Sequence, residues 1–450
     1  MKRYFALALA VLLLFGLTAC AGKTSSTETQ TPAASETTPA ADSTESGSSE
    51  EPIIIHVWSE DIETTLPLNE AFYEYTNHKY KIEYTPIPST EMVAKVQTAL
   101  AAGSPLGDLI MVDYPYRGLF YEMGILEDIS QPPYNYDPET TIPALLPLQS
   151  GPNGEFYGPE YVAVGAMAYK RDLTEKYFGV SEPEDVEALF TNWAEFKELG
   201  LKVKEASDGE VYLMPSVGGF YDVLRGYQEG SYVNGTELTL KSYLGPIFDT
   251  LIDFTQAGLI DVFENLSNEE SASYSKYNHI FYPMPPYLIS QVLKANDPDG
   301  AGSWGLILPT GTAYAMPSGA MLVPKSAVNK EGAVEYLKFI HNTIEGATAA
   351  MEFKSSFVSN RSLYEPDANF YTQEDPYFAG QDIWKVYADR GLGQLQTAIL
   401  VTPYDNDFTD ACRQALLTIN ATRGNCNTDD LLDQIADDLM MKHAELTRVN

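Results

Sequence analysis

The sequence of 450 residues predicts an α/β protein in which mostly parallel sheets are flanked by helices. Between residues 53 and 124, short runs rich in β-branched residues alternate with amphipathic segments. This order is typical of a parallel sheet with helices on both faces. About 400 residues follow the first fifty, which is enough for two large hydrophobic cores. No repeat of solenoid length interrupts the pattern.

The first twenty residues are typical of a bacterial lipoprotein export signal. Lys2 and Arg3 supply a positive start, and residues 6–17 form an apolar stretch too short for a permanent membrane helix. Residues 17–20 read Leu-Thr-Ala-Cys and resemble a lipobox, which implies a signal peptide of residues 1–19 and lipid on the Cys20 thiol. Such lipid anchors a protein to the outer face of the cell membrane. The alternative is an ordinary secretory peptide with an incidental cysteine.

Residues 20–51 are expected to form a flexible tether that starts at the lipidated cysteine. The stretch consists almost entirely of Ser, Thr, Glu, Ala, Pro, Gly and Asp. Without aromatic or large aliphatic side chains it cannot bury enough apolar surface to offset the entropy of ordering. Its Ser, Thr and Pro content also fits a glycosylated stalk, an alternative that composition leaves open. A folded body is expected from residue 52.

The charge balance disfavours two classes of partner. Removing Lys2 and Arg3 with the signal leaves 26 basic side chains against 63 acidic ones, a net charge near −37. This excess of negative charge disfavours binding to nucleic acid and to anionic lipid headgroups. It suits a solvated exterior outside the cytoplasm, and by itself it does not identify a cationic ligand.

The body is expected to open with three strands and three helices in alternation. Apolar, β-branched runs predict the strands, and 3.6-residue spacing predicts the helices. Ser89 is placed to cap the second helix and Gly103 to end it. The expected strands are 53–58, 81–84 and 108–113, and the expected helices are 66–76, 90–102 and 119–123.

From residue 156 the pattern changes. Residues 157–161 are expected to form an irregular crossing segment, and Thr191 or Asn192 is expected to cap a later helix. The expected strands are 163–169, 303–308 and 319–323. The expected helices are 173–178, 193–204, 243–257, 287–294, 330–341, 408–421 and 429–446.

Five segments carry a family resemblance through their order and spacing. They are GDLIMVDYPYRGLFYEMGILEDIS (107–130), NGEFYGPEYVAVGAMAYKRDLTEKYFG (153–179), TNWAEFKELGLKVKE (191–205), WGLILPTG (304–311) and GAMLVPKSAVNKEGAVEYLKFI (319–340). Together they resemble the extracellular solute-binding proteins of bacterial ABC importers, in the carbohydrate-type branch that includes maltose-binding-like proteins. The chain departs from that pattern at Glu160, where an aromatic residue usually follows proline, at the inserted Asn192, and over residues 206–242, which have no counterpart. These departures leave the ligand open.

The resemblance implies a two-lobed fold of the periplasmic-binding-protein kind, joined by a hinge of crossing segments. Lobe 1 would comprise residues 52–161 plus 313–342, and lobe 2 would comprise residues 162–312 plus 343–450. A solute, most often a sugar or an oligosaccharide, would bind in the cleft between the lobes and pass to a membrane permease. We expect such a protein to act as a monomer.

Candidate ligand-binding residues follow from the chemistry of sugars. A sugar offers flat apolar faces and a rim of hydroxyls, so its site needs aromatic side chains beside hydrogen-bonding groups. The candidates lie after strand ends, on the crossing segments or on exposed helix turns, and packing or a solvated surface is the alternative for each. They are Trp58, Glu60, Asp113, Tyr114, Tyr116, Glu160, Tyr161, Tyr221, Arg225, Trp304, Tyr314, Ser318 and Trp384. Tyr221 and Arg225 are placed after an expected turn at Gly218 and Gly219.

The sequence leaves open an alternative function, alternative ligands and a possible disulfide. No H-E-x-x-H, G-x-S-x-G or phosphate-binding loop occurs, so we expect no enzyme, no cofactor and no metal site. A surface glycoside hydrolase that uses two cleft carboxylates is the enzyme alternative. Peptides and polyamines are the alternative ligands, and a polyamine would suit an acidic, aromatic cleft. Cys412 lies in an expected helix and Cys426 in the loop behind it, and the sequence leaves open whether they form a disulfide.

Overall fold

The computed structural model describes residues 51–449 except residues 61, 63, 64, 277, 317, 365–369, 393, 394 and 396–399. The expected signal peptide, most of the tether and the expected lipid site Cys20 lie outside the described residues. From Glu50 onward the chain forms one compact unit. Among the helices of the described part, none combines the length and the apolarity that crossing a bilayer requires.

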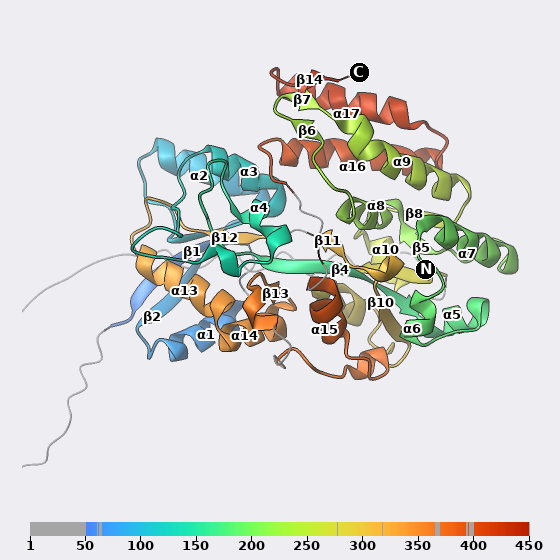
Figure 1. The fold of residues 1–450 in the computed structure, drawn as a ribbon, viewed down its shortest axis with the longest axis horizontal. Coiled ribbons are helices and arrows are strands. Elements are labelled where there is room, and N and C mark those ends of the chain that lie inside the picture. Colours follow the sequence, from blue (N-terminus) through green and yellow to red (C-terminus); the bar gives the residue numbers. More distant parts are fainter. Residues whose placement is uncertain are drawn as a thin grey trace, which may run out of the picture. The chain divides into compact units, whose positions relative to one another are not determined.

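The first sheet has the strand order β12-β3-β1-β2 (Figure 1). β1 pairs in parallel with both β2 and β3, and β12 pairs antiparallel with β3. The strands are β1 (Ile53–Ser59), β2 (Tyr80–Pro86), β3 (Leu109–Val112) and β12 (Ala320–Leu322). The flanking helices are α1 (Leu66–Tyr75), α2 (Ser89–Ala101), α3 (Tyr114–Glu122), α13 (Lys330–Asn342) and α14 (Ile344–Lys354). The alternation predicted for this region is confirmed.

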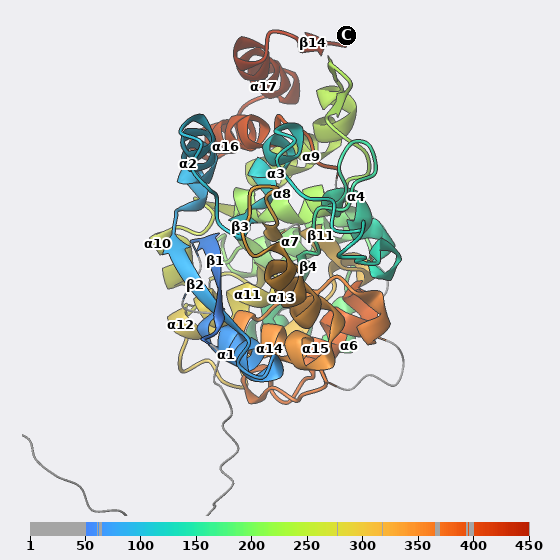
Figure 2. The same cartoon turned by 90° about the vertical axis from the view of Figure 1, so that its left-hand side faces the viewer.

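Helices cover both faces of this sheet. Met321 and Val57 pack on one face with side chains of α1, α13 and α14. Figure 2 shows these three helices near one another. Ala320 and Leu322 pack on the other face with side chains of α2 and α3. The alternation along β12 follows from the two-residue period of a strand. α14 therefore packs with the first sheet, although residues 343–450 were assigned to lobe 2 from the sequence.

The second sheet is built around the long strand β4 (Tyr161–Lys170). All its partners are antiparallel to it, so the expectation of a mostly parallel second sheet is wrong. An apolar run is compatible with either direction of pairing, which is why the sequence did not distinguish them. The partners are β9 (Phe281–Met284), β10 (Trp304–Ile307), β11 (Tyr314–Met316) and β13 (Phe357–Val358). Smaller sheets pair β5 (Met214–Ser216) with β8 (Ile260–Phe263), and join β6 (Val233–Asn234), β7 (Glu237–Leu238) and β14 (Thr447–Arg448).

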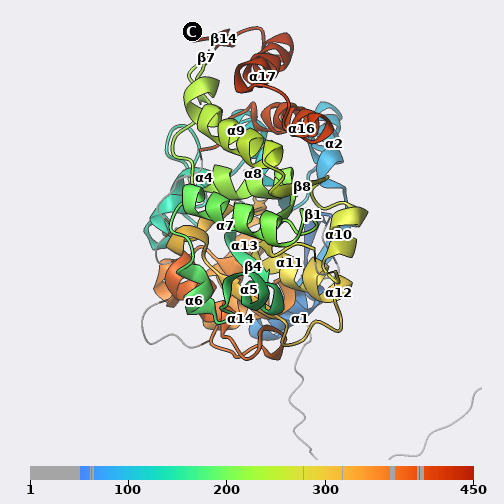
Figure 3. The same ribbon diagram turned by 90° about the vertical axis from the view of Figure 1, so that its right-hand side faces the viewer.

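The remaining helices pack around the second sheet and beyond it, and Figure 3 shows α7, α8 and α9 stacked in sequence. Asn192 caps α7, because its side chain accepts a hydrogen bond from the Glu195 amide at 3.0 Å. The expected helix 287–294 is instead a short α-helix, a π-helical turn over Ile289–Leu293 and a second short α-helix. The helices are α4 (Leu146–Gln149), α5 (Arg171–Phe178), α6 (Pro183–Glu187), α7 (Trp193–Ala206), α8 (Val217–Gly226), α9 (Leu240–Gln256), α10 (Asn268–Ser273), α11 (Pro286–Leu288), α12 (Lys294–Asn296), α15 (Ile383–Lys385), α16 (Asp405–Thr422) and α17 (Thr428–Lys442).

β4 links the two sheets. Tyr161 at its start packs with the core of the first sheet, while Val164 and Tyr169 pack in two different cores around the second sheet. Just before β4, Glu160 forms a bridge with Ala320 of β12. The chain therefore passes directly from one sheet to the other at residues 160 and 161, within the region where a crossing segment was predicted.

Candidate ligand-binding site

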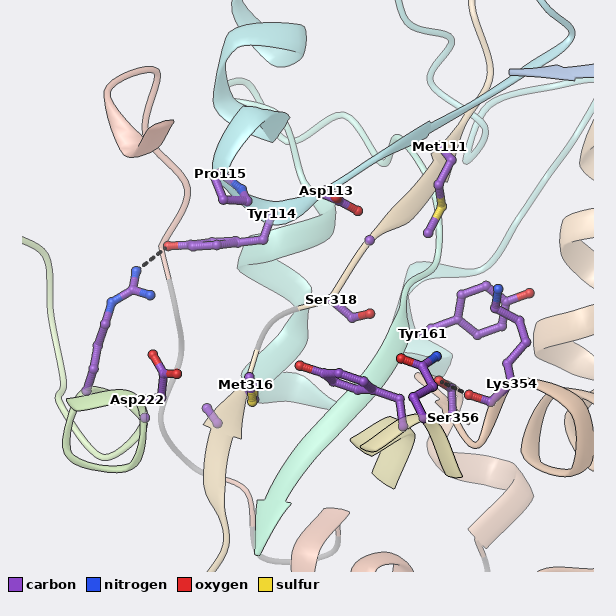
Figure 4. A pocket seen from close by; sticks show the side chains of 16 residues that line it. Met111, Asp113, Tyr114, Pro115, Tyr161, Asp222, Met316, Ser318, Lys354 and Ser356 are labelled. Atoms are coloured by element: carbon purple, nitrogen blue, oxygen red, sulfur yellow. Dashed lines mark hydrogen bonds between the residues drawn. The ribbon is translucent and has the colours of Figure 1, made fainter. Parts of the chain in front are cut away.

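A cavity of about 510 Å³ opens where side chains from the two sheets and α8 converge (Figure 4). Five of the predicted site residues line it: Asp113, Tyr114, Tyr161, Arg225 and Ser318. They come from the end of β3, the start of α3, the start of β4, α8 and the segment before β12. The cavity thus lies at a carboxyl end of the first sheet, where α/β folds commonly bind ligands.

Asp113 and Tyr114 reach the cavity because α3 begins earlier than the sequence predicted. The helix starts at Tyr114 rather than at residue 119, with Pro115 in its first turn and Asp113 in extended conformation at its N-cap position. Proline is well suited to the first turn, because that turn has no intrahelical acceptor for its backbone amide. The strand end and the first helical turn together present both side chains to the cavity.

Tyr114 contacts Arg225 across the cavity wall. Nη2 of Arg225 donates to the Tyr114 hydroxyl at 3.1 Å, drawn as a dashed line in Figure 4. The centre of the guanidinium lies 5.4 Å from the Tyr114 ring centre, within range of a cation–π contact. Burial raises the pKa of the Tyr114 hydroxyl far above its usual value, so it stays protonated at neutral pH. α3 and α8 are thereby joined by a neutral hydroxyl and a cation.

The charged side chains of the cavity are of both signs. Asp113 and Asp222 supply carboxylates, and Arg225 and Lys354 supply cations. Burial raises the pKa of the Asp222 carboxyl to about 6, although Arg225 and the hydrogen bond from Asn265 both favour the ionised form. Lys354 Nζ lies 5.2 Å from the centre of the Tyr161 ring. The cavity therefore offers both acceptors and donors beside aromatic faces.

α8 has a different local structure from the one predicted. Gly218 and Gly219 do not form a turn; they lie buried in the first turn of the helix, which Ser216 caps by accepting from the Gly219 amide at 3.1 Å. A Cβ at residue 218 would stand 2.8 Å from Asn265, so glycine permits the close packing of α8 on its neighbour. Arg225 lies two turns further on and reaches the cavity.

Glu160 lies beside the cavity and does not line it. Its carboxylate is buried against Arg117 of α3, with 3.0 Å between Oε2 and Nη1, and it accepts a hydrogen bond from the amide of Ser318 at 2.7 Å. Glu160 was predicted to lie on the crossing segment, and its ion-pair partner Arg117 was not predicted. Arg117 lies in the interior of a short helix, where an exposed arginine is the usual expectation.

Two of the predicted aromatic residues belong to the hydrophobic cores. Trp304 is fully buried, and its indole N–H donates to Asp297 at 2.9 Å. Tyr314 is also fully buried, because its ring lies against the glycine of β4: a Cβ at residue 165 would stand 1.9 Å from that ring. Both side chains are therefore withdrawn from the cavity by packing.

The other predicted residues also lie off the cavity. Tyr221 is buried beside Phe248, and Trp384 packs on Phe357. Trp58 and Tyr116 pack partly buried on the core below α2 and α3. Glu60 accepts a hydrogen bond from the Ser89 amide at 2.7 Å. The Ser89 side chain is not the cap of α2, because the helix begins at Ser89 and Pro88 stands at the N-cap position.

Several lining residues were missed by the sequence analysis. Asp222 lies three residues before Arg225, a spacing that places both on one helix face and could have identified it. The others gave no local signal, because no short sequence pattern tells whether a side chain on a strand, a helix or a loop turns to the cavity or to a core. The missed lining residues include Met111, Asp222, Tyr287, Gln291, Met316, Lys354 and Ser356.

The two cysteines of the body are free, so the disulfide alternative is not realised in the structure. Cys412 is buried in α16, which continues to Thr422 before Cys426 follows in the next loop. Ten helical residues span about 15 Å, whereas a disulfide needs Cα atoms within about 7 Å. Burial raises the pKa of the Cys412 thiol to about 12. In the described ranges, no three His, Cys, Asp or Glu side chains are grouped to hold a metal ion.

The fold and the cavity define a class of protein that encloses a small solute between α/β sheets. A family model described as bacterial extracellular solute-binding protein matches residues 69–379. The chain belongs to this family, which places its work outside the cytoplasm.

Solved structures confirm the α/β fold of this class. The sugar-binding protein MalE from Xanthomonas citri matches with a TM-score of 0.68 and 17% identity, over 87% of this chain and 98% of that chain. The galacto-N-biose-/lacto-N-biose I-binding protein of Bifidobacterium longum, in complex with lacto-N-biose, matches at 0.67 and 16%, over 89% and 99%. The ABC transporter associated binding protein from B. animalis subsp. lactis Bl-04, in complex with β-1,6-galactobiose, matches at 0.66 and 18%, over 88% and 99%.

Proposed function

We propose that this chain is the substrate-binding component of an ABC importer and captures a sugar or short oligosaccharide in the cavity of about 510 Å³. The observation that carries the proposal is the lining itself, in which Tyr114, Tyr161 and Tyr287 stand among carboxylates and cations. Tyrosine rings suit the apolar faces of a sugar, and the charged groups suit its hydroxyls. The sugar complexes of the solved neighbours support this ligand class.

The cavity supports a polyamine less well. A polyamine needs an excess of carboxylates over cations, and here Arg225 and Lys354 balance Asp113 and Asp222. The large negative charge of the chain as a whole is therefore not concentrated in the cavity lining. A neutral ligand with many hydroxyls matches a lining of balanced charge, because it can both donate and accept.

The protein acts by binding and release, without catalysis, as a monomer. We assign residues 52–161 plus 313–342, together with α14, to one lobe, and residues 162–312 with the chain that follows α14 to the other. Closure of the lobes on the solute would be the state that a permease recognises. The Tyr114–Arg225 hydrogen bond joins α3 to α8, so it would form or break as the lobes close or open.

The lipid anchor completes the proposal. Lipid on Cys20 and a tether over residues 20–51 would hold the body close to the outer face of the membrane and to the permease. Mass spectrometry of the N-terminal peptide from membrane fractions tests this directly. Lipid mass on Cys20, lost together with membrane attachment in Cys20→Ala, supports the anchor; an unmodified cysteine contradicts it.

A thermal-shift screen tests the ligand class. The purified chain is melted with maltose, lacto-N-biose or β-1,6-galactobiose, with spermidine, and with short peptides. We expect at least one sugar to raise the melting temperature in proportion to the logarithm of its concentration. A shift with spermidine or peptides and none with sugars contradicts the sugar assignment. Cleavage of a bound glycan on prolonged incubation contradicts the non-enzymatic role.

A further inference from the structure

A buried ion pair joins two segments beside the cavity. Arg117, in the middle of α3, has a side chain with no exposed surface, and the Glu160 side chain is only 1% exposed. Nη1 of Arg117 lies 3.0 Å from Oε2 of Glu160. Removing both ions from water is costly, and further hydrogen bonds are needed to offset that cost.

Those further hydrogen bonds converge on the backbone of Ser318. Its amide donates to Oε1 of Glu160 at 2.7 Å, and its carbonyl accepts from Nη2 of Arg117 at 2.7 Å. Nη1 of Arg117 also donates to the carbonyl of Leu148 at 3.2 Å, which fixes the guanidinium from another side. The ion pair therefore holds both backbone polar groups of one residue, and that residue lines the cavity.

The same pair fixes a second part of the cavity wall. Arg117 is one turn from Tyr114 on α3, so anchoring its side chain also anchors the turn that presents Asp113 and Tyr114. Gly319 then packs closely on this turn, because a Cβ at residue 319 would stand 3.0 Å from Oδ1 of Asp113. Arg117 and Glu160 therefore connect the α3 wall to the Ser318 wall.

A buried ion pair is a weak argument for a role in stability. Apolar residues of similar volume often replace a buried ion pair with no loss of stability. Apolar residues cannot supply the guanidinium donors and carboxylate acceptors that bind both the carbonyl and the amide of one backbone residue. Neither Arg117 nor Glu160 lines the cavity.

We propose that Arg117 and Glu160 are positioning residues of the solute site: they hold Ser318 and the first turn of α3 at the separation that the solute requires, without touching the solute. The inference rests on the proposed function for the solute itself. The part of the proposal that concerns the hydrogen bonds to the Ser318 backbone does not depend on any ligand.

The experiment compares the full chain with Arg117→Met/Glu160→Leu and with a matched control. The control is Arg390→Met/Glu187→Leu, because Glu187 also accepts from an arginine and from a backbone amide, that of Leu308 at 3.2 Å, and does not line the cavity. Hydrogen–deuterium exchange, measured without sugar, gives the exchange rate of the Ser318 amide. We expect exchange at least about 10-fold faster in the Arg117/Glu160 variant, since its buried acceptor is gone, and unchanged in the control.

Titration calorimetry with maltose, lacto-N-biose and β-1,6-galactobiose measures the effect on binding. For a sugar that binds the wild-type chain, we expect the Kd to be about 10-fold higher in the Arg117/Glu160 variant, a loss of binding free energy comparable to that of one hydrogen bond. In the control variant we expect the Kd to be unchanged. Arg117→Lys keeps the positive charge but loses the planar guanidinium that donates to two acceptors at once. It should therefore also speed the exchange of the Ser318 amide and raise the sugar Kd, and it serves as the test if the double variant fails to fold.

The outcomes separate the two proposals. Unchanged Ser318 exchange, or faster exchange with unchanged sugar affinity, overturns the positioning role. If none of the three sugars binds the wild-type chain, the proposed function fails, and the exchange measurement alone still decides whether the pair holds Ser318.

Discussion

The Tyr114 hydroxyl and the Arg225 guanidinium, 3.1 Å apart, connect helices that belong to different hydrophobic cores. α3 contributes Phe120 to the core of the first sheet, and α8 contributes Phe220 to a core beside the second sheet. The hydroxyl is also 3.4 Å from the carbonyl of Leu400, its own acceptor. One tyrosine thus links three segments that meet at the cavity.

Removing that hydroxyl should weaken solute binding. In Tyr114→Phe the ring stays and the hydrogen bond from Arg225 is lost, so a buried donor has one partner fewer. We expect the sugar Kd to rise about 5- to 10-fold, corresponding to about 1 kcal/mol. Tyr116→Phe is the matched control, since Tyr116 does not line the cavity. Equal effects of the two substitutions on calorimetric affinity would contradict the role of Tyr114.

Asp222 should make the protein less stable as the pH rises. Burial raises the pKa of its carboxyl from 3.8 to about 6, so between these values the folded state binds more protons than the unfolded state. The free energy of unfolding contributed by this group therefore falls as the pH rises from 3.8 to 6. We expect the free energy of unfolding of Asp222→Asn, relative to that of the wild type, to increase by about 2 kcal/mol between pH 4 and pH 7. Urea denaturation at both pH values measures this; parallel pH profiles would rule it out.

His341 should have the opposite effect. It is buried beside the Tyr161 ring, and burial lowers the pKa of its imidazole from 6.5 to about 3. Between these values the unfolded state binds more protons, so the free energy of unfolding falls as the pH is lowered from 6.5 towards 3. We expect His341→Phe to reduce this acid-induced loss by up to about 4 kcal/mol. His78→Gln, at an exposed histidine, should keep the wild-type acid sensitivity.

Asp108 should be important for stability rather than for binding. Its buried carboxylate accepts three backbone amides, from His56 at 2.9 Å, Val328 at 2.8 Å and Asn329 at 2.7 Å. Asp108→Ala leaves these donors without their acceptor, and we expect a loss of about 3–5 kcal/mol in the free energy of unfolding. Asp108→Asn keeps one acceptor oxygen and should lose less. Urea midpoints with unchanged m-values measure both; equal midpoints for Asp108→Ala and the wild type would contradict the prediction.

Local patterns predicted the elements of the first sheet and many of the helices. β1, β2 and β3 were found from β-branched runs, and Asn192 was one of the two residues expected to cap α7. These features depend on neighbours in the sequence, so they can be read from a short window. The antiparallel pairing of β4 depends on where distant strands return, and no local pattern encodes that.

In the candidate site, too, local patterns predicted some residues and could not predict others. Asp113 was placed at the cavity because it follows a strand, and the structure puts it there. Tyr314 was predicted at the cavity because it flanks the return crossing, yet its ring is buried because glycine at residue 165 leaves room for it on β4. Whether a side chain turns to the cavity or to the core depends on the volume opposite it. Lys354, at the end of α14, carries no pattern that separates it from any other surface lysine.

β4 contributes side chains to three separate cores within ten residues, from Tyr161 to Lys170. Melting any one of these cores would strip support from the others through that shared strand. We therefore expect the three cores to lose their structure together on heating, because each of them shares β4 as a packing partner.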